Sequence, residues 1–270
     1  MPWYYWPKCA VGLGLANSAW QRRGIIPPGD QVGATTGMGK QMRHFTATFA
    51  TAGIAILVGG CGAGDNQASV KSSTTTTSLI PRPVVGRELD ALLLNPEQIN
   101  PLMGATGMAI TRKHDAMSDD SATMQPKECL AIDGSAQAQV YADSGFTAMR
   151  DQALNDGNNF THYAEQAVVL FPTAKQANVF FIASGLHWPA CHQYTHIQSG
   201  SEWTVGPISD DNGALSAIAT QQNAKAGGWA CGRALAIKNN VIVDVNTCSA
   251  NPANSAVDIA NQIVAKVPLR

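Results

Sequence analysis

The segment Ala230–Cys248, "ACGRALAIKNNVIVDVNTC", decides the fold of this chain. Two mainly apolar runs flank Lys238-Asn239-Asn240, and asparagines favour the tight turn of a β-hairpin because they tolerate a positive φ. Cys231 and Cys248 stand eight residues before Asn239 and eight residues after Asn240. Paired strands lie about 5 Å apart, which brings two such cysteines within disulfide-bonding range. We therefore predict an antiparallel hairpin closed by a Cys231–Cys248 disulfide.

Further strands are predicted on both sides of this hairpin. Alternating or continuous apolar runs indicate strands over residues 144–154 and 161–171, 192–197 and 202–208, and 214–222. The segments "NDGNN" and "SDDNG" supply turns between neighbouring strands. "RKHDAMSDDSATMQPKEC", residues 112–129, is interpreted as a loop.

Helices are predicted at both ends of the domain and in its middle. Residues 87–94 form a short amphipathic helix, and Asn95 caps a second helix that has Pro96 at its first position. Thr173 caps a central helix, and Asn251, followed by Pro252, caps the last helix. The expected buried residues of these last two helices are Ala177, Phe180, Phe181, Ser184, Val257, Ile259, Ile263 and Val267. The fold class is therefore α+β: an antiparallel β-sheet with helices packed on it.

The cysteines also bear on the compartment in which the domain works. An exported domain with four cysteines is expected to hold two disulfides, and four cysteines allow three pairings. The hairpin geometry selects Cys231–Cys248, which leaves Cys129 with Cys191. This second bond would join the loop before the sheet to the end of the central helix.

An apolar run before the domain predicts export and a membrane anchor. "FTATFATAGIAILVGG", residues 45–60, follows Lys40 and Arg43 and carries no charge, as in a signal peptide. Val58-Gly59-Gly60-Cys61 resembles the lipobox of bacterial lipoproteins, in which the cysteine is acylated and becomes the first mature residue. The alternative is a plain transmembrane anchor, although sixteen residues are short for one. Either reading places the domain on the outer face of the cytoplasmic membrane, in the cell envelope.

These patterns divide the chain into four parts. Residues 1–37, with Cys9, are interpreted as an over-extended or disordered start, the alternative being a real cytoplasmic extension. Residues 38–60 form the signal peptide, and residues 61–85, rich in Ser, Thr, Gly and Pro, form a flexible tether that is either glycosylated or unmodified. Residues 86–270 form the folded domain.

The charge distribution argues against nucleic-acid binding. Residues 1–60 hold five basic residues and one acidic residue, whereas residues 61–270 hold thirteen basic and eighteen acidic residues. Nucleic-acid binding needs clustered Lys and Arg to neutralise phosphates, and the domain has no such stripe.

Five segments of the domain together resemble a known family. They are "QAVVLFPTAKQANVFFIAS", "WPAC", "EWTVGPIS", "GGWACGRALAIKNNVIVDVNTC" and "NPANSAVDIANQIVAKV", and the resemblance extends over residues 88–270. They resemble the PknH-like extracellular domain, the sensor domain of a mycobacterial membrane Ser/Thr kinase that also occurs alone in lipoproteins. The resemblance implies a sheet-based α+β domain, the two disulfides named above, a cleft for an unidentified ligand and no established enzymatic activity. The chain carries no kinase signature and is similar to the free-standing lipoproteins.

The candidate chemistry of the domain is limited. His187, His192 and His196 gather around Cys191, but no carboxylate has ligand spacing, so we predict neither a metal nor a cofactor. Ser184 lies inside a predicted helix and not on a nucleophile elbow, which argues against a hydrolase. Aromatic residues with a polar tip suit either a core or a ligand cleft, and the candidates are Trp188, Trp203, Trp229 and Tyr194.

The sequence thus predicts a lipid-anchored envelope protein whose non-catalytic, sensor-like domain binds an unidentified small ligand in a cleft. The alternative is a module that binds another envelope protein, such as a kinase ectodomain. A third hypothesis, a hydrolase of envelope material, would require convergent groups with perturbed pKa values.

Overall fold

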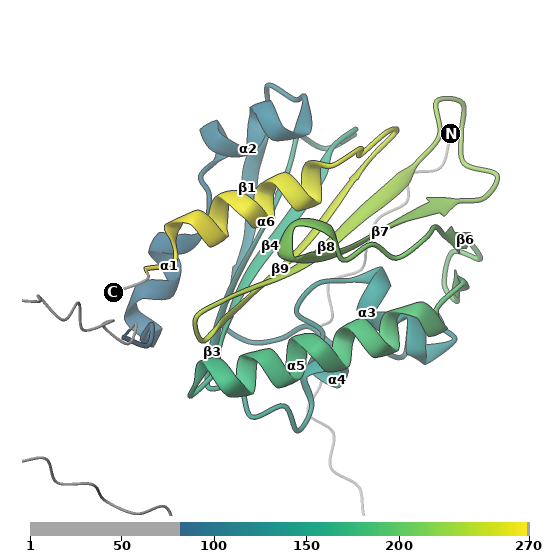
Figure 1. Cartoon of the computed structure of the whole chain (residues 1–270). Helices are drawn as coiled ribbons and strands as arrows, with labels where there is room; N and C mark the ends of the chain where they lie inside the picture. The colour runs from purple at the N-terminus through teal and green to yellow at the C-terminus, as the bar shows by residue number, and fades with distance from the viewer. Residues whose placement is uncertain (1–81, 269–270) are drawn as a thin grey trace, which may run out of the picture. The chain divides into compact units, whose positions relative to one another are not determined.

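A nine-stranded antiparallel sheet forms the centre of the domain, in the strand order β1-β3-β4-β9-β8-β7-β6-β5-β2 (Figure 1). The computed structural model describes residues 82–268. The expectations for residues 1–37 and 38–60, for Cys61 and for most of the tether lie outside these residues. The strands are β1 (Ala109–His114), β2 (Met124–Gln125), β3 (Ala148–Asn155), β4 (Tyr163–Leu170), β5 (Gln193–His196), β6 (Glu202–Val205), β7 (Ala214–Gln221), β8 (Ala230–Lys238) and β9 (Val241–Ser249).

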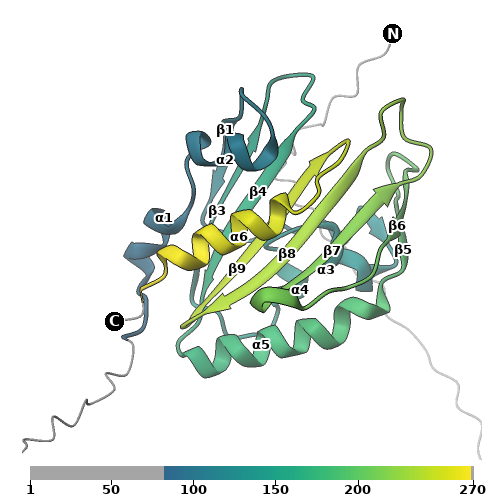
Figure 2. The same cartoon turned by 45° about the horizontal axis from the view of Figure 1, so that its top comes forward.

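Helices cover both faces of this sheet (Figures 1 and 2). The α-helices are α1 (Leu89–Leu92), α2 (Pro96–Met103), α3 (Leu130–Asp133), α4 (Ala138–Tyr141), α5 (Ala174–His187) and α6 (Ser255–Lys266). Short 3-10 turns are η1 (Gly86–Glu88), η2 (Lys127–Cys129), η3 (Trp188–Ala190) and η4 (Asp211–Gly213). Helix α6 crosses β7, β8 and β9 on one face, with α1 and α2 beside it, whereas α5, α3 and α4 lie on the other face. The predicted α+β class is confirmed.

The hairpin that decides the fold forms as predicted. In β8 and β9, Cys231 stands opposite Cys248, with 4.1 Å between their Cα atoms, and the two form a disulfide. Asn239 takes the positive φ of 55° that the turn needs, which an asparagine accepts at low cost. The second predicted disulfide, Cys129–Cys191, is also present.

Alternation along β9 divides the core into two clusters. Val241, Val243 and Val245 face α6, whereas Ile242 faces α5. This period of two is the pattern of a strand that is buried on both faces. The α5 side also receives the polar residues Asp244 and Asn246 at the next positions along β9, both of them buried. The α5 side is therefore the face on which polar chemistry gathers.

Two predicted helix caps are confirmed and one is wrong. The side chains of Asn95 and Thr173 accept hydrogen bonds from the backbone N–H groups of Gln98 and Gln176. Helix α6, however, begins at Ser255 and not at Pro252. The intervening Ala253 has a φ of 44°, which lies outside the right-handed helical region and separates Pro252 from the helix.

The predicted loop over residues 112–129 is also partly wrong. Its first three residues complete β1, an edge strand that pairs with β3, and Met124 and Gln125 form β2 against β5. Most of β1 is exposed, and its sequence lacks the apolar alternation of a buried strand. Residues 86–88 and 89–92 form the first predicted helix in two short pieces. Phe181 on α5 and Val257 on α6, both expected to be buried, are half-buried.

None of the helices between residues 82 and 268 has the length and apolar character that crossing a membrane requires.

Candidate ligand-binding groove

An open groove of about 360 Å³ runs along α5 on the polar face of the sheet. One wall is α5 with the adjoining Trp188, and the other is the segment from α3 to the loop after α4. The lining residues are Ala131, Val140, Ala142, Asp143, Ser144, Gln176, Val179, Phe180, Ala183, Ser184, His187 and Trp188. Apolar side chains with a few polar groups at the edge are typical of sites for small amphipathic molecules. Ser144 Oγ is buried and makes no hydrogen bond within the described residues.

The Cys129–Cys191 disulfide ties the two walls of the groove together. Cys129 directly precedes α3, and Cys191 directly follows the turn that contains Trp188. Their Cα atoms are 4.9 Å apart. The bond therefore limits how far the α3 wall and the α5 wall can separate at this end of the groove.

A buried ion pair lies beneath the groove. Arg233 on β8 and Asp244 on β9 are 2.5 Å apart, and both side chains are almost completely buried. The Cζ atom of the Arg233 guanidinium lies 5.5 Å from the centre of the Trp188 indole ring, so the two groups form a cation–π contact. Because Trp188 belongs to the α5 wall, Arg233 supports this wall from the sheet side.

The same ion pair holds the opposite wall. Asp244 accepts hydrogen bonds from the Tyr141 hydroxyl (2.9 Å) and the Ala136 backbone N–H (3.0 Å), and Arg233 donates to the Gly134 carbonyl (2.9 Å). Tyr141 stacks on Phe180 of α5 with 4.3 Å between ring centres. Burial, together with the neighbouring carboxylate, raises the pKa of Tyr141 well above its ordinary value, so its hydroxyl remains a donor. One buried pair thus positions both walls of the groove.

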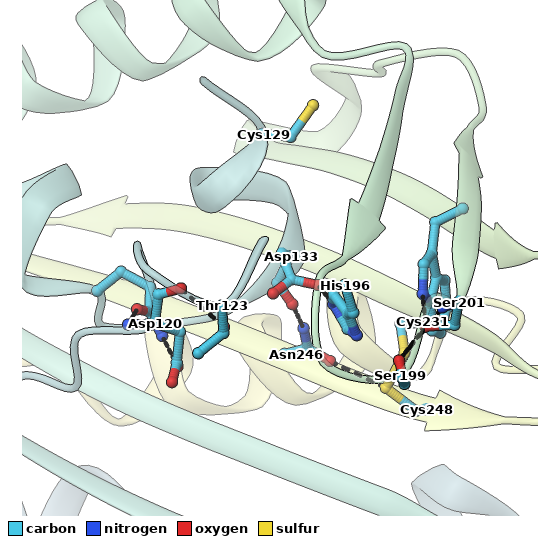
Figure 3. Close-up of polar contacts among 12 residues, drawn as sticks. Asp120, Thr123, Cys129, Asp133, His196, Ser199, Ser201, Cys231, Asn246 and Cys248 are labelled. Carbon is cyan, nitrogen blue, oxygen red and sulfur yellow. Dashed lines mark hydrogen bonds and ion pairs between the residues drawn. A yellow bond between two sulfur atoms is a disulfide. The ribbon is translucent and has the colours of Figure 1, made fainter. Parts of the chain in front are cut away.

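A second polar contact fixes the far side of α3 (Figure 3). His196 Nε2 lies 2.6 Å from Asp133 Oδ1, and Asn246 donates to the Asp133 carbonyl over 2.7 Å. Burial opposes protonation of His196, but its hydrogen bond and charge interaction with Asp133 outweigh burial and raise its pKa. The contact joins α3 to β5 and β9.

The three histidines noted in the sequence do not form a site. His187 is at the edge of the groove, His192 is exposed and His196 is paired with Asp133. Within residues 82–268, no three His, Cys, Asp or Glu side chains come together as a metal-ligand set.

Of the four aromatic residues predicted to line a cleft, the structure places Trp188 in the groove. Tyr194 and Trp203 are buried and stack on each other with 5.8 Å between ring centres, and neither is a lining residue. Trp229 packs near Phe160, with 6.1 Å between ring centres, and is also not a lining residue of the groove. The remaining lining residues were not predicted, and nor was the Arg233–Asp244 pair. The available sequence signal was one basic residue in the interior of β8 and one acidic residue in β9, both strands being otherwise mainly apolar there.

A separate group of charges lies on β1, β3 and β4. Arg112 bonds Glu165 and lies 3.7 Å from Asp151, whose side chain is 3% exposed and makes no hydrogen bond within the described residues. Tyr163 donates to Glu165 over 2.8 Å. Burial, and secondarily the charge of Glu165, raises the pKa of Asp151 to about 8. Asp151 is therefore held as the neutral acid at pH 7.

This arrangement predicts a pH-dependent stability. The unfolded chain releases the Asp151 proton near pH 4, whereas the folded chain keeps it up to about pH 8, so stability falls as pH rises between these values. We expect Asp151→Asn to flatten this decline and to raise the free energy of unfolding at pH 8 by about 1–3 kcal/mol. Urea unfolding at pH 5 and pH 8, followed by circular dichroism, measures the free energy of unfolding at each pH and therefore its decline between them. Asp90→Asn, which changes an exposed carboxylate, is the control, and equal pH profiles for wild type and Asp151→Asn would contradict the assignment.

Comparison with known proteins places this architecture in a family. The model of the PknH-like extracellular domain matches residues 84–266. Over 192 residues the chain is 35% identical to the Serine/threonine-protein kinase PknH of Mycobacterium bovis and of Mycobacterium tuberculosis, and 69% of this chain is covered. The chain spans about a third of the length of these kinases.

A solved structure agrees with this match. The crystal structure of the extracellular domain of PknH from Mycobacterium tuberculosis aligns with a TM-score of 0.64 and 34% identity, over 68% of this chain and 97% of that one. The family match covers more than half of the chain and includes the sheet, both disulfides and the groove. The chain therefore belongs to the PknH-like extracellular domain family.

Proposed function

We propose that this chain is a lipid-anchored protein of the cell envelope whose domain captures a small amphipathic molecule in the groove beside α5, without catalysing a reaction. The observation that carries the proposal is the construction of the groove. Its walls come from segments far apart in the sequence, and a disulfide and a buried ion pair connect them. Rigid walls favour binding because less conformational entropy is lost when the ligand is held.

The lining indicates the kind of molecule that fits. Val140, Val179, Phe180 and Trp188 present apolar surface, and Gln176 and His187 add polar groups to the lining. An uncharged or weakly polar molecule with an apolar body matches this surface. We assign the groove no catalytic role because the polar groups beneath it, those of Arg233, Asp244 and Tyr141, bond to one another.

Blocking the groove tests this function. The probe is N-phenyl-1-naphthylamine, a neutral apolar fluorophore with one N–H donor, whose emission rises in an apolar site. We expect saturable binding that Ala183→Phe weakens about tenfold, which corresponds to about 1.4 kcal/mol. Asn178→Phe is the matched control, since Asn178 is exposed on the same helix outside the groove lining. Equal affinity for the two variants would overturn the assignment of the groove.

The anchor is tested separately. Growth with an alkyne-bearing fatty acid should label the wild-type chain, and Cys61→Ser should abolish the label and release the protein from the membrane fraction. Labelling that persists in Cys61→Ser would contradict lipidation at this cysteine.

A further inference from the structure

Helix α5 presents an apolar stripe to solvent. Val179, Ile182 and Leu186 are exposed by 60%, 55% and 75%, and their spacing of three and four residues places them on one side of the helix. The opposite side packs on the sheet through Ala177 and Phe180. A helix that is apolar on both sides is normally covered on both, so the outer stripe of α5 lacks a partner in the described chain.

The charge carried by α5 and the turn after it points to the kind of surface that covers this stripe, and Asp143, across the groove from Val179, is the one carboxylate of the groove lining. No Asp or Glu occurs between residues 174 and 190, although residues 82–268 hold seventeen acidic and eleven basic residues. Lys175 is the one Lys or Arg of α5. A bilayer with anionic headgroups repels carboxylates and accepts apolar side chains beside a basic residue.

The described chain begins close to the start of the same helix. Val84 N donates to Asn240 Oδ1 over 2.8 Å, and Asn240 Nδ2 donates to the Phe171 carbonyl over 2.8 Å. Phe171 stands two residues before Thr173, the cap of α5. Val84, whose side chain packs in the cluster on the α6 side, therefore lies at the end of the sheet where α5 begins. The 22 residues between Cys61 and Val84 span at most about 75 Å when extended.

From these three observations we infer that the outer face of α5, formed by Val179, Ile182 and Leu186, rests on the lipid bilayer in the anchored protein. The inference rests on the lipid anchor proposed at Cys61. The groove shares Val179 with this face, so it opens next to the bilayer surface.

Relaxation of methyl signals by a lipid-borne spin label tests this orientation. Residues 61–270 are coupled through Cys61, the one thiol outside the two disulfides, to a maleimide lipid in anionic bicelles that carry a gadolinium-chelating lipid. We expect loss of the methyl signals of Val179, Ile182 and Leu186. The signal of Ile218, which is 40% exposed on β7 and faces the α6 side, should persist. The double variant Ile182→Gln/Leu186→Gln should restore the Val179 signal, whereas Ile218→Gln should not.

Two outcomes would overturn the inference. Equal relaxation at Ile182 and Ile218 would show that the domain has no preferred face toward the bilayer. A dimer in sedimentation without lipid, abolished by Ile182→Gln/Leu186→Gln, would assign the stripe to a second copy of the chain. The lipid is coupled to Cys61 in vitro, so the relaxation test does not depend on lipidation in the cell. The fluorophore assay contains no lipid, so groove binding is measured independently of the orientation on the bilayer.

Discussion

Replacing Arg233 with methionine is expected to lower the free energy of unfolding by about 3–5 kcal/mol. Methionine fills much of the same space but leaves the buried Asp244 carboxylate without its cation. The change also removes the hydrogen bond to Gly134 and the cation–π contact with Trp188. The α3–α4 wall and the α5 wall of the groove therefore lose a shared support.

Chemical denaturation with matched variants measures this effect. Arg150→Met breaks an ion pair with Asp90 at the surface and should cost less than about 1 kcal/mol. The double variant Arg233→Met/Asp244→Asn should recover about half of the loss, because the neutral amide still accepts from Tyr141 and Ala136 without a buried charge. A loss below about 1 kcal/mol for Arg233→Met would contradict the role given to this pair.

Removal of the Cys129–Cys191 disulfide is expected to have an effect of similar size. The bond closes a loop of 62 residues, and loop-closure entropy predicts a loss of about 4 kcal/mol for Cys129→Ser/Cys191→Ser. The hairpin bond closes 17 residues, and the corresponding loss for Cys231→Ser/Cys248→Ser is about 3 kcal/mol. Because only the first bond joins the groove walls, its loss should also weaken binding of N-phenyl-1-naphthylamine.

Denaturation and fluorophore titration of the two double variants, side by side, separate these effects. The hairpin variant is the control for loss of a disulfide outside the groove. If both variants bound the fluorophore as the wild type does, the Cys129–Cys191 bond would have no part in shaping the groove.

The sequence predicted those parts of the fold that local spacing determines. The hairpin and its disulfide follow from the distance of Cys231 and Cys248 from the turn, and the caps at Asn95 and Thr173 depend on residues only three positions away. The pairing of Cys129 with Cys191 followed by elimination and is confirmed.

Long-range packing determines what the sequence did not predict. Strand β1 exists because β3 offers it an edge, and its own residues are too polar to indicate a strand. The start of α6 depends on the conformation of Ala253. Aromatic character alone could not separate Trp188, which faces the groove, from Trp203, which packs on Tyr194 in the core. Ligand capture itself stays a prediction.

Native mass spectrometry tests that prediction most directly. The protein is produced with its signal peptide, residues 38–60, in a mycobacterial host, purified from the envelope without denaturation, and compared with the Ala183→Phe variant. Our account predicts a reproducible non-covalent adduct on the wild-type protein that leaves on collisional activation, is absent from Ala183→Phe and is retained by Asn178→Phe. A wild-type protein free of adduct, under conditions in which it retains N-phenyl-1-naphthylamine, or an adduct of equal abundance on Ala183→Phe, would contradict ligand capture in this groove.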